Sequence, residues 1–430
     1  MSSRVLYISY DGMTDALGQS QVLPYLCGLA QRGHQITLIS AEKPEVFAAG
    51  RTTVEKIVAE AGIDWQPTVY TKRPPIVSTL KDILKIKRLA LSLQRRNGFD
   101  IVHCRSYIAA FVGLAMKNKF GCRFVFDMRG FYADERVDGN IWNTKKLIYR
   151  LVYNFFKRKE KVFMTESDAI VSLTNAAKNE ILQWNLPNVA ADKITVIPCC
   201  ADVNHFDYNT VNQTDIDDWH KKLNISPDTF VLSYLGSVGT WYMLPEMMDF
   251  FSELLKYKPD AQFLFITRDS RKMILDEAER HGIGSDRIVV QPATRSEVPS
   301  LAMLSDASLF FIKPVWSKKA SSPTKLAELM ALGIPCLTNR GVGDVDEIMS
   351  RNPQGVLIDG WNSADYAAAI EKMLKLPPDG RSQSRQMACE MFSLENGVAA
   401  YNIVYERVKS NLPNTQHPTP KNKCRQNFYI

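Results

Sequence analysis

Residues 321–335 have the sequence Ser-Ser-Pro-Thr-Lys-Leu-Ala-Glu-Leu-Met-Ala-Leu-Gly-Ile-Pro, which predicts a short helix and the turn that ends it. Ser322 is a typical N-cap residue, and Pro323 suits the first helical position because no intrahelical hydrogen bond is lost there. Gly333 is typical of the position just after a helix. Because we expect a strand at 336–339, the segment joins a helix to a strand, which is the repeating step of an α/β fold.

The same alternation of helix and strand extends over most of the chain. Runs rich in Val, Ile, Leu and Phe are separated by amphipathic stretches of helix length. The runs are continuously apolar, which is typical of parallel strands covered by helices on both faces. The expected strands are 5–10, 35–40, 101–103, 123–128, 169–173 and 193–197 in the first half, and 230–235, 262–267, 287–291, 307–313, 336–339 and 355–358 in the second.

The length of 430 residues predicts two domains, because single cores stop growing at about 250 to 300 residues. The apolar periodicity stops within 201–227, where we expect a linker. We therefore predict two Rossmann-like, doubly wound domains, 1–200 and 228–391, which face each other across a cleft. An amphipathic helix at 392–410 is expected to pack back on the first domain, and 411–430 to form a flexible tail.

The composition indicates a soluble, cytoplasmic protein. Apolar residues make up 45% and charged residues 23% of the chain, and we find no run of about 20 apolar residues that could span a bilayer. The N-terminal residues lack the apolar stretch and cleavage site of a signal peptide. The eight cysteines have no Cys-x-x-Cys spacing. No group of His, Cys and carboxylate residues has metal-ligand spacing, so we expect no metal and no other cofactor.

The net charge of +7 raises the question of an anionic partner. Basic residues concentrate in segments 78–96 and 145–159, where apolar and aromatic residues lie between them. Each segment is either a helix that packs on a core and exposes a solvated face, or a helix that lies on an anionic lipid surface. We expect no nucleic acid partner. Contact with the inner face of the cell membrane is the alternative that the charge pattern leaves open.

Lys325 is in an unusual place for a cation. It falls in the first turn of the predicted helix, where the positive end of the helix dipole disfavours a positive charge. A phosphate or diphosphate at this point would be bound by free backbone N–H groups and by the ammonium together. Glu328 lies one turn further on the same face and could accept hydrogen bonds from a ribose diol. The alternative is a surface ion pair between Lys325 and Glu328.

Residues 322–335 resemble the donor-binding motif of family 4 glycosyltransferases, which are retaining enzymes of the GT-B fold. Other parts of the chain resemble the same family in the same order: Gly33-His34 before a strand, residues 99–103, Ile197-Pro198 between the halves, and Leu235-Gly236-Ser237. The resemblance implies a GT-B fold, a nucleotide-sugar donor held by the second domain, an acceptor held by the first, and retention at the anomeric carbon.

The resemblance also implies individual site residues. Glu328 would contact the nucleotide ribose. The donor would be bound by Gly18 in the first loop, Gly236 and Ser237 after the first strand of the second domain, and Ser321, Ser322, Thr324 and Lys325. The candidates for catalysis are His103, Asp127, Arg268 and Lys325. For His103 the alternative is a structural histidine, and for Asp127 it is an ion pair with Arg129 that braces the loop.

Two positions depart from the family pattern. Many members have a second glutamate eight positions before the first, which here is Ala320. Many also have an Arg and a Lys after the glycine loop, whereas residues 236–242 contain neither. Arg268, Lys313 and Lys325 are the available cations. Without one of them, the leaving diphosphate would develop its charge with little stabilisation.

We therefore predict a hexosyltransferase-type enzyme that moves a sugar from a nucleotide-diphosphate donor to an acceptor hydroxyl with retention. The basic helices suggest an acceptor glycan on a lipid carrier, and so a role in cell-envelope polysaccharide or glycan assembly at the membrane surface. Two alternatives stay open: an isomerase similar to nucleotide-sugar 2-epimerases, and a non-catalytic glycosyltransferase-like partner subunit.

Overall fold

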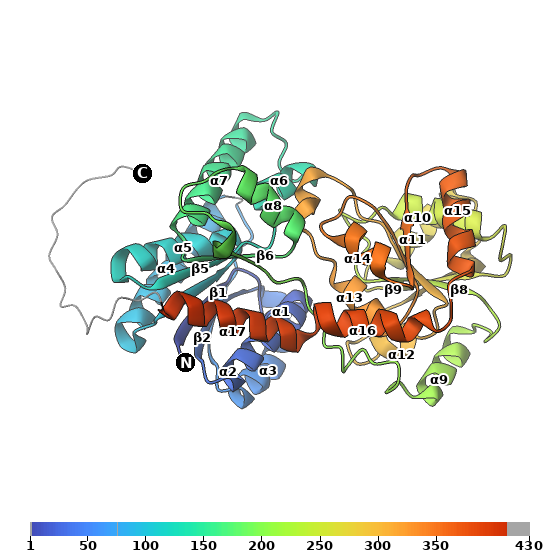
Figure 1. The fold of residues 1–430 in the computed structure, drawn as a ribbon, viewed down its shortest axis with the longest axis horizontal. Coiled ribbons are helices and arrows are strands. Elements are labelled where there is room, and N and C mark those ends of the chain that lie inside the picture. Colours follow the sequence, from blue (N-terminus) through green and yellow to red (C-terminus); the bar gives the residue numbers. More distant parts are fainter. Residues whose placement is uncertain (1, 75, 411–430) are drawn as a thin grey trace.

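The computed structural model describes residues 2–74 and 76–410, which form two parallel β-sheets with helices packed around each (Figure 1). The first sheet has the strand order β3-β2-β1-β4-β5-β6-β7, and the second β10-β9-β8-β11-β12-β13. Both orders reverse direction beside the first strand of the domain, which is the doubly wound arrangement. The prediction of two doubly wound parallel sheets is confirmed.

The strands of the first sheet are β1 (Arg4–Ser9), β2 (Gln35–Glu42), β3 (Asp64–Val69), β4 (Ile101–Arg105), β5 (Arg123–Asp127), β6 (Ala169–Ser172) and β7 (Ile194–Val196). Those of the second are β8 (Val231–Leu235), β9 (Gln262–Ile266), β10 (Ile288–Gln291), β11 (Ala307–Phe310), β12 (Cys336–Asn339) and β13 (Gly355–Ile358). Strand β3 was not predicted from the sequence. This edge strand contains Pro67 and leaves most of its residues partly or fully exposed, so it lacks a continuous apolar run.

The helices of the first half are α1 (Ala16–Gln21), α2 (Leu23–Gln31), α3 (Pro44–Glu60), α4 (Val77–Asn97), α5 (Ser106–Phe120), α6 (Tyr132–Asp138), α7 (Leu147–Glu166) and α8 (Asn175–Gln183). They continue as α9 (Gln213–Leu223), α10 (Leu244–Leu254), α11 (Arg271–Arg280), α12 (Val298–Ala302), α13 (Thr324–Ala331), α14 (Val345–Arg351), α15 (Ser363–Leu374), α16 (Gly380–Phe392) and α17 (Leu394–Ser410). Short 3-10 helices are η1 (Ala191–Lys193), η2 (Ser285–Arg287) and η3 (Trp316–Ala320). Every helix within the described ranges is too short or too polar to span a bilayer.

The segment 201–227, expected as a linker, contains α9. Ile216 and Trp219 of α9 are buried in the core of the second sheet, and the Trp219 indole donates a hydrogen bond to Ser300 Oγ over 3.1 Å. This helix was missed because most of its other residues are polar. Its amphipathic face consists of few apolar side chains within an otherwise polar stretch.

The chain returns to the first domain at its end. Helix α16 packs on α13 in the second domain, whereas α17 packs on α2 in the first (Figure 1). Between them, Ser393 pairs with Ala201 in a short parallel bridge. Tyr401 and Tyr405 of α17 are buried in the core beneath the first sheet. The predicted flexible tail at 411–430 lies outside the described residues.

Candidate active site

A cavity of about 340 Å³ lies where the two domains meet, at the carboxyl ends of the first sheet's strands. Ligands of doubly wound sheets bind at this end, because the strand order reverses there and leaves a crevice. The first domain contributes Asp11, Leu17, Arg105, Ser106, Arg129, Leu173 and Cys199, and the second Trp241, Tyr242, Ile312, Lys318, Ser321, Ser322, Pro323 and Thr324.

Helix α13 begins at Thr324, two residues later than the predicted cap. Pro323 has extended backbone and no side chain caps the helix. The Ser322 hydroxyl instead accepts a hydrogen bond from the backbone N–H of Cys199, over 3.2 Å. The prediction of an N-cap at Ser322 is therefore wrong, because this side chain ties the start of α13 to the first domain. The first N–H groups of α13 are consequently left without a side-chain partner.

Lys325 is buried, with 7% of its surface exposed, and its ammonium has no hydrogen-bond partner among the described residues. The Nζ atom lies 4.0 Å from the ring centroid of Tyr234 and 3.8 Å from that of Tyr242. Burial holds the pKa of Lys325 well below its usual range, although Glu328 opposes this effect. Aromatic faces stabilise a cation only partly. The alternative, an ion pair between Lys325 and Glu328, does not form within 4.0 Å, so the ammonium has no anionic partner in the described part of the chain.

Gly236 leaves room above this ammonium. Its φ angle is +105°, a conformation that favours glycine, and a Cβ atom placed there would lie 3.4 Å from Lys325 Nζ. The loop after β8 is held by Asp269, which accepts hydrogen bonds from Ser237 Oγ over 2.8 Å and from Val238 N over 2.7 Å. The predicted donor residues Gly236, Ser237 and Lys325 therefore lie together.

Glu328 is half-buried, one turn further along α13. Burial raises the pKa of its carboxyl to about 7, with the nearby cations Arg295 and Lys325 acting in the opposite direction. Arg268, predicted to neutralise the diphosphate, is exposed and its guanidinium donates a hydrogen bond to the Ala293 carbonyl over 3.2 Å. Arg268 is thus not part of the cavity wall. Two buried lysines of the second domain lie in this region: Lys318, which lines the cavity, and Lys325 of α13.

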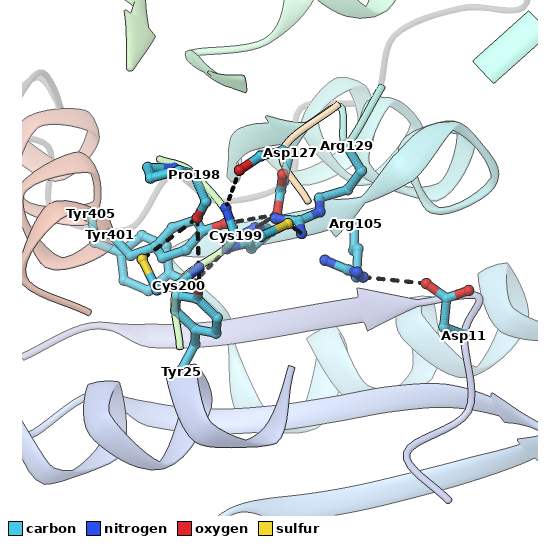
Figure 2. A network of polar contacts seen from close by, with 12 residues as sticks. Asp11, Tyr25, Arg105, Asp127, Arg129, Pro198, Cys199, Cys200, Tyr401 and Tyr405 are labelled. Atoms are coloured by element: carbon cyan, nitrogen blue, oxygen red, sulfur yellow. Dashed lines mark hydrogen bonds and ion pairs between the residues drawn. The ribbon is translucent and has the colours of Figure 1, made fainter. Parts of the chain in front are cut away.

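His103 and Asp127 contact tyrosines of α17 and do not line the cavity; Figure 2 shows Asp127 near Tyr401. His103 Nδ1 is 2.7 Å from the Tyr405 hydroxyl, and the Tyr401 hydroxyl donates to Asp127 over 2.9 Å. The two side chains are 1% and 0% exposed, and burial lowers the pKa of His103. The structure therefore places them in the packing between α17 and the strands β4 and β5. Sequence reasoning put them at the cleft because both stand near strand ends.

Gly18 is buried in α1 and does not line the cavity. A Cβ atom at this position would lie 2.2 Å from the Gly12 carbonyl oxygen, so glycine is needed for the first loop to fold against its own helix. Its neighbour Leu17 and Asp11 at the other end of the loop do reach the cavity. Gly18 thus supports the loop that carries Asp11 and Leu17, without itself lining the cavity.

Arg105 and Lys318 were missed by the sequence analysis. Arg105 ends β4, and its Nε lies 3.2 Å from Asp11 Oδ2. Lys318 lies 3.0 Å from Glu135 Oε1 and 3.7 Å from the ring centroid of Trp241. A signal for Arg105 was its place between an apolar strand and the following helix, which puts it at the ligand-binding edge of a parallel sheet.

The surroundings of Ala320 account for the absence of the second glutamate that many family members have at this position. It is 1% exposed and belongs to the core cluster of the first domain, against which η3 of the second domain is docked. Lys319 also bridges the domains, with Nζ 2.8 Å from Glu180. A carboxylate at position 320 would be buried among apolar side chains, at a large desolvation cost.

Sequence models of two families match the chain. They are Glycosyltransferase Family 4 over residues 20–205 and Glycosyl transferases group 1 over residues 215–389. The chain belongs to the family 4 glycosyltransferases. Among curated proteins, this glycosyltransferase is 23% identical over 381 residues to N-acetyl-alpha-D-glucosaminyl L-malate synthase of Bacillus anthracis, with 88% of this chain and 90% of that protein covered.

Solved structures confirm the GT-B fold of this glycosyltransferase. Sucrose-phosphate synthase from Thermosynechococcus elongatus superimposes with a TM-score of 0.72 at 13% identity, covering 95% of this chain and 99% of that one. The Anabaena protein HepE, in complex with UDP and glucose, has a TM-score of 0.68 at 13% identity, with 95% and 100% covered. The resemblance seen in residues 322–335 is thereby confirmed at the level of family and fold.

Proposed function

We propose that this glycosyltransferase transfers a sugar from a nucleoside diphosphate donor, bound by the second domain, to an acceptor hydroxyl presented by the first domain. The observation that carries the proposal is the buried, unpartnered ammonium of Lys325 beside the uncapped start of α13. An anion placed there gains both the ammonium and the free backbone N–H groups. A diphosphate supplies such an anion, and the UDP bound to HepE supports this choice.

The chemistry follows from this placement. The bond between the anomeric carbon and the diphosphate oxygen breaks, the acceptor oxygen bonds to the same carbon, and the acceptor proton passes to the departing phosphate oxygen. Retention, which is general in the family, requires the acceptor to approach on the face that the diphosphate leaves. The protein contributes preorganised charge at Lys325 and alignment of both substrates. We expect no metal ion, because Lys325 supplies the cation.

A thermal-shift panel of uridine, guanosine and adenosine diphosphate sugars tests the donor. A bound donor stabilises the folded state by mass action, by about 2.7 kcal/mol at 100 times its Kd. Incubation with the stabilising donor alone should leave the sugar configuration unchanged apart from slow hydrolysis. If that incubation epimerised the sugar, the isomerase alternative would replace this proposal, and if no member of the panel shifted the melting temperature, donor binding would be excluded.

Glu328 is proposed to hold the ribose diol. We expect Glu328→Gln to weaken binding of the preferred nucleoside diphosphate by about tenfold or more, because hydrogen bonds to a charged group contribute about 1.5 to 3 kcal/mol. The variant should bind the 2′,3′-dideoxy analogue as well as the wild type does. Calorimetric titration with both nucleotides measures this. Equal losses for the two nucleotides would show that Glu328 does not contact the diol.

We also propose that the first domain binds an anionic membrane surface, in keeping with cell-envelope glycan assembly. Helices α4 and α7 both pack on α5 (Figure 1). Both also expose apolar side chains together with basic ones. The exposed apolar residues are Val77, Leu80 and Leu84 in α4, and Leu147, Ile148, Leu151, Phe155 and Val162 in α7. Apolar side chains beside exposed lysines and arginines fit the boundary between acyl chains and anionic headgroups.

Vesicle co-sedimentation tests this membrane contact. Neutralising Lys85, Lys87 and Arg88 with glutamine should weaken binding to phosphatidylglycerol-containing vesicles by about 100-fold, since each basic residue contributes about 1 kcal/mol near such a surface. Leu151→Glu should also weaken it, whereas Leu374→Glu, at an exposed position in the second domain, should not. Equal sedimentation of all variants would contradict the proposal.

A further inference from the structure

Two arginines face the cavity from neighbouring strands of the first sheet. Arg105 is the last residue of β4, where it pairs in register with Asp127 of β5, and Arg129 follows two residues later. Their side chains are only 4% and 11% exposed. Both nonetheless line the cavity, to which the second domain contributes residues 321–324 at the start of α13. Two guanidinium groups thus lie at the same edge of the acceptor-binding domain.

Much of their hydrogen-bonding capacity is unused. Arg105 donates through Nε to Asp11, and its two terminal nitrogens donate to no group in the described parts of the chain (Figure 2). Arg129 Nη2 donates to the Cys199 sulfur over 3.3 Å, a weak acceptor. Its Nη1 lies 3.9 Å from Asp127, which is beyond hydrogen-bonding distance. The nitrogens without a hydrogen bond are not among the fully buried polar atoms, so a ligand in the cavity can reach them and the wall is suited to an anion.

The start of helix α5 adds to this wall. Arg105 is the N-cap residue of α5, which has 15 residues, and no side chain caps its first N–H groups. Ser106, its first residue, lines the cavity. The positive end of the helix dipole and the free N–H groups therefore point to the same place as the two guanidinium groups.

We propose that the acceptor carries a phosphate or diphosphate group, and that Arg105, Arg129 and the start of α5 bind this group. The inference rests on the proposed transferase function and names the class of its acceptor. A phosphate has more acceptor oxygens than a carboxylate, and so matches the number of free donors on this wall. Bound there, the anion holds the acceptor between the two domains and brings its hydroxyl toward the donor sugar.

The test is calorimetric titration of inorganic pyrophosphate into protein saturated with the nucleoside diphosphate from the donor panel. Saturation fills the Lys325 site, so that pyrophosphate reports on the second anion site. We expect binding that falls by about tenfold or more in Arg105→Gln and in Arg129→Gln, because charge-assisted hydrogen bonds are lost. Arg51→Gln, which removes a surface arginine of the same domain, should bind like the wild type.

Three results would overturn the inference. These are no pyrophosphate binding to the nucleotide-saturated protein, equal binding in both cleft variants and the wild type, or a loss of nucleoside diphosphate affinity in the variants without loss of pyrophosphate affinity. The last would assign both arginines to the donor. Failure of every nucleotide to bind would instead defeat the proposed function, and pyrophosphate titrated into the free protein would still test the arginines.

A second titration distinguishes the source of the phosphate. Farnesyl diphosphate carries the same anion on a prenyl chain, so tighter binding than pyrophosphate indicates a lipid-linked acceptor. Equal binding indicates a soluble phosphorylated acceptor. Either result supports the inference, provided that both ligands lose affinity in Arg105→Gln and Arg129→Gln and keep it in Arg51→Gln.

Discussion

Replacing Lys325 with methionine is expected to stabilise the free protein and to remove most of its transferase activity. The ammonium of Lys325 is buried between Tyr234 and Tyr242 without an anion, so its charge destabilises the folded state. Methionine fills similar space without that charge, and so removes the cost of a buried polar group without a partner, which is about 1 to 3 kcal/mol. Activity should fall by about 100- to 1,000-fold, as when one preorganised contact to developing charge is removed.

Denaturant unfolding and steady-state kinetics measure the two effects. Lys272→Met, at an exposed position in the same domain, should change neither quantity appreciably. A Lys325→Met protein that bound the donor as tightly as the wild type would show that the ammonium does not meet the diphosphate. A variant less stable than the wild type would show that the aromatic contacts already satisfy the charge.

The pKa of Lys325 gives this prediction a pH dependence. In the folded protein the pKa is lowered by burial, whereas in the unfolded chain it is near 10.4. Between these values the unfolded state holds more protons, so the stability contributed by this group rises with pH. The stability advantage of Lys325→Met should therefore shrink as the pH increases. Wild-type and variant unfolding curves across the alkaline range measure it.

Diphosphate binding should raise the pKa of Lys325 again and take up a proton. Calorimetry in two buffers of different ionisation enthalpy measures this uptake. The experiment is best done in Glu328→Gln, because the Glu328 carboxyl has a pKa of about 7 and would titrate in the same range. Lys325→Met in that background should show no uptake.

The sequence predicted those parts of the fold that depend on local pattern. Continuous apolar runs located the buried strands, and the unfavourable position of Lys325 at the positive end of the helix dipole indicated the candidate donor site. Strand β3 and helix α9 were not predicted, because an edge strand and a mostly polar helix contain few apolar residues. The role of His103 could not be read locally, since its partner Tyr405 lies 302 positions away on α17.

The proposed phosphate-binding residues of the first domain, Arg105 and Arg129, were harder to predict. Arg105 and Arg129 become neighbours only when β4 and β5 pair, and residues of the second domain complete the cavity that they line. The need for a small apolar residue at position 320 likewise follows from the packing of η3 on the first domain, which the local sequence does not indicate. Contacts of this kind are set by tertiary packing, which short-range periodicity does not specify.

The second large effect concerns Asp127, whose replacement by alanine is expected to destabilise the first domain by about 3 to 5 kcal/mol. Although burial opposes its ionisation, Arg129 and His103 hold the pKa of Asp127 below its usual range, so the carboxylate is charged. Its removal leaves the buried Arg129 guanidinium without a counter-charge and the Tyr401 hydroxyl without an acceptor. Helix α17 then loses a buried anchor to β5.

Hydrogen exchange and denaturant unfolding test this assignment. Amides of α17 should exchange faster in Asp127→Ala, while binding of the donor nucleotide below the melting temperature should persist, because Lys325 and Glu328 belong to the second domain. Tyr401→Phe is the matched control, since it removes the same hydrogen bond but keeps the charge, and should cost only about 1 kcal/mol. If Asp127→Ala kept wild-type stability and nucleotide binding yet lost turnover, Asp127 would act on the substrate. Helix α17 would then have to move during the reaction to expose the Asp127 carboxylate.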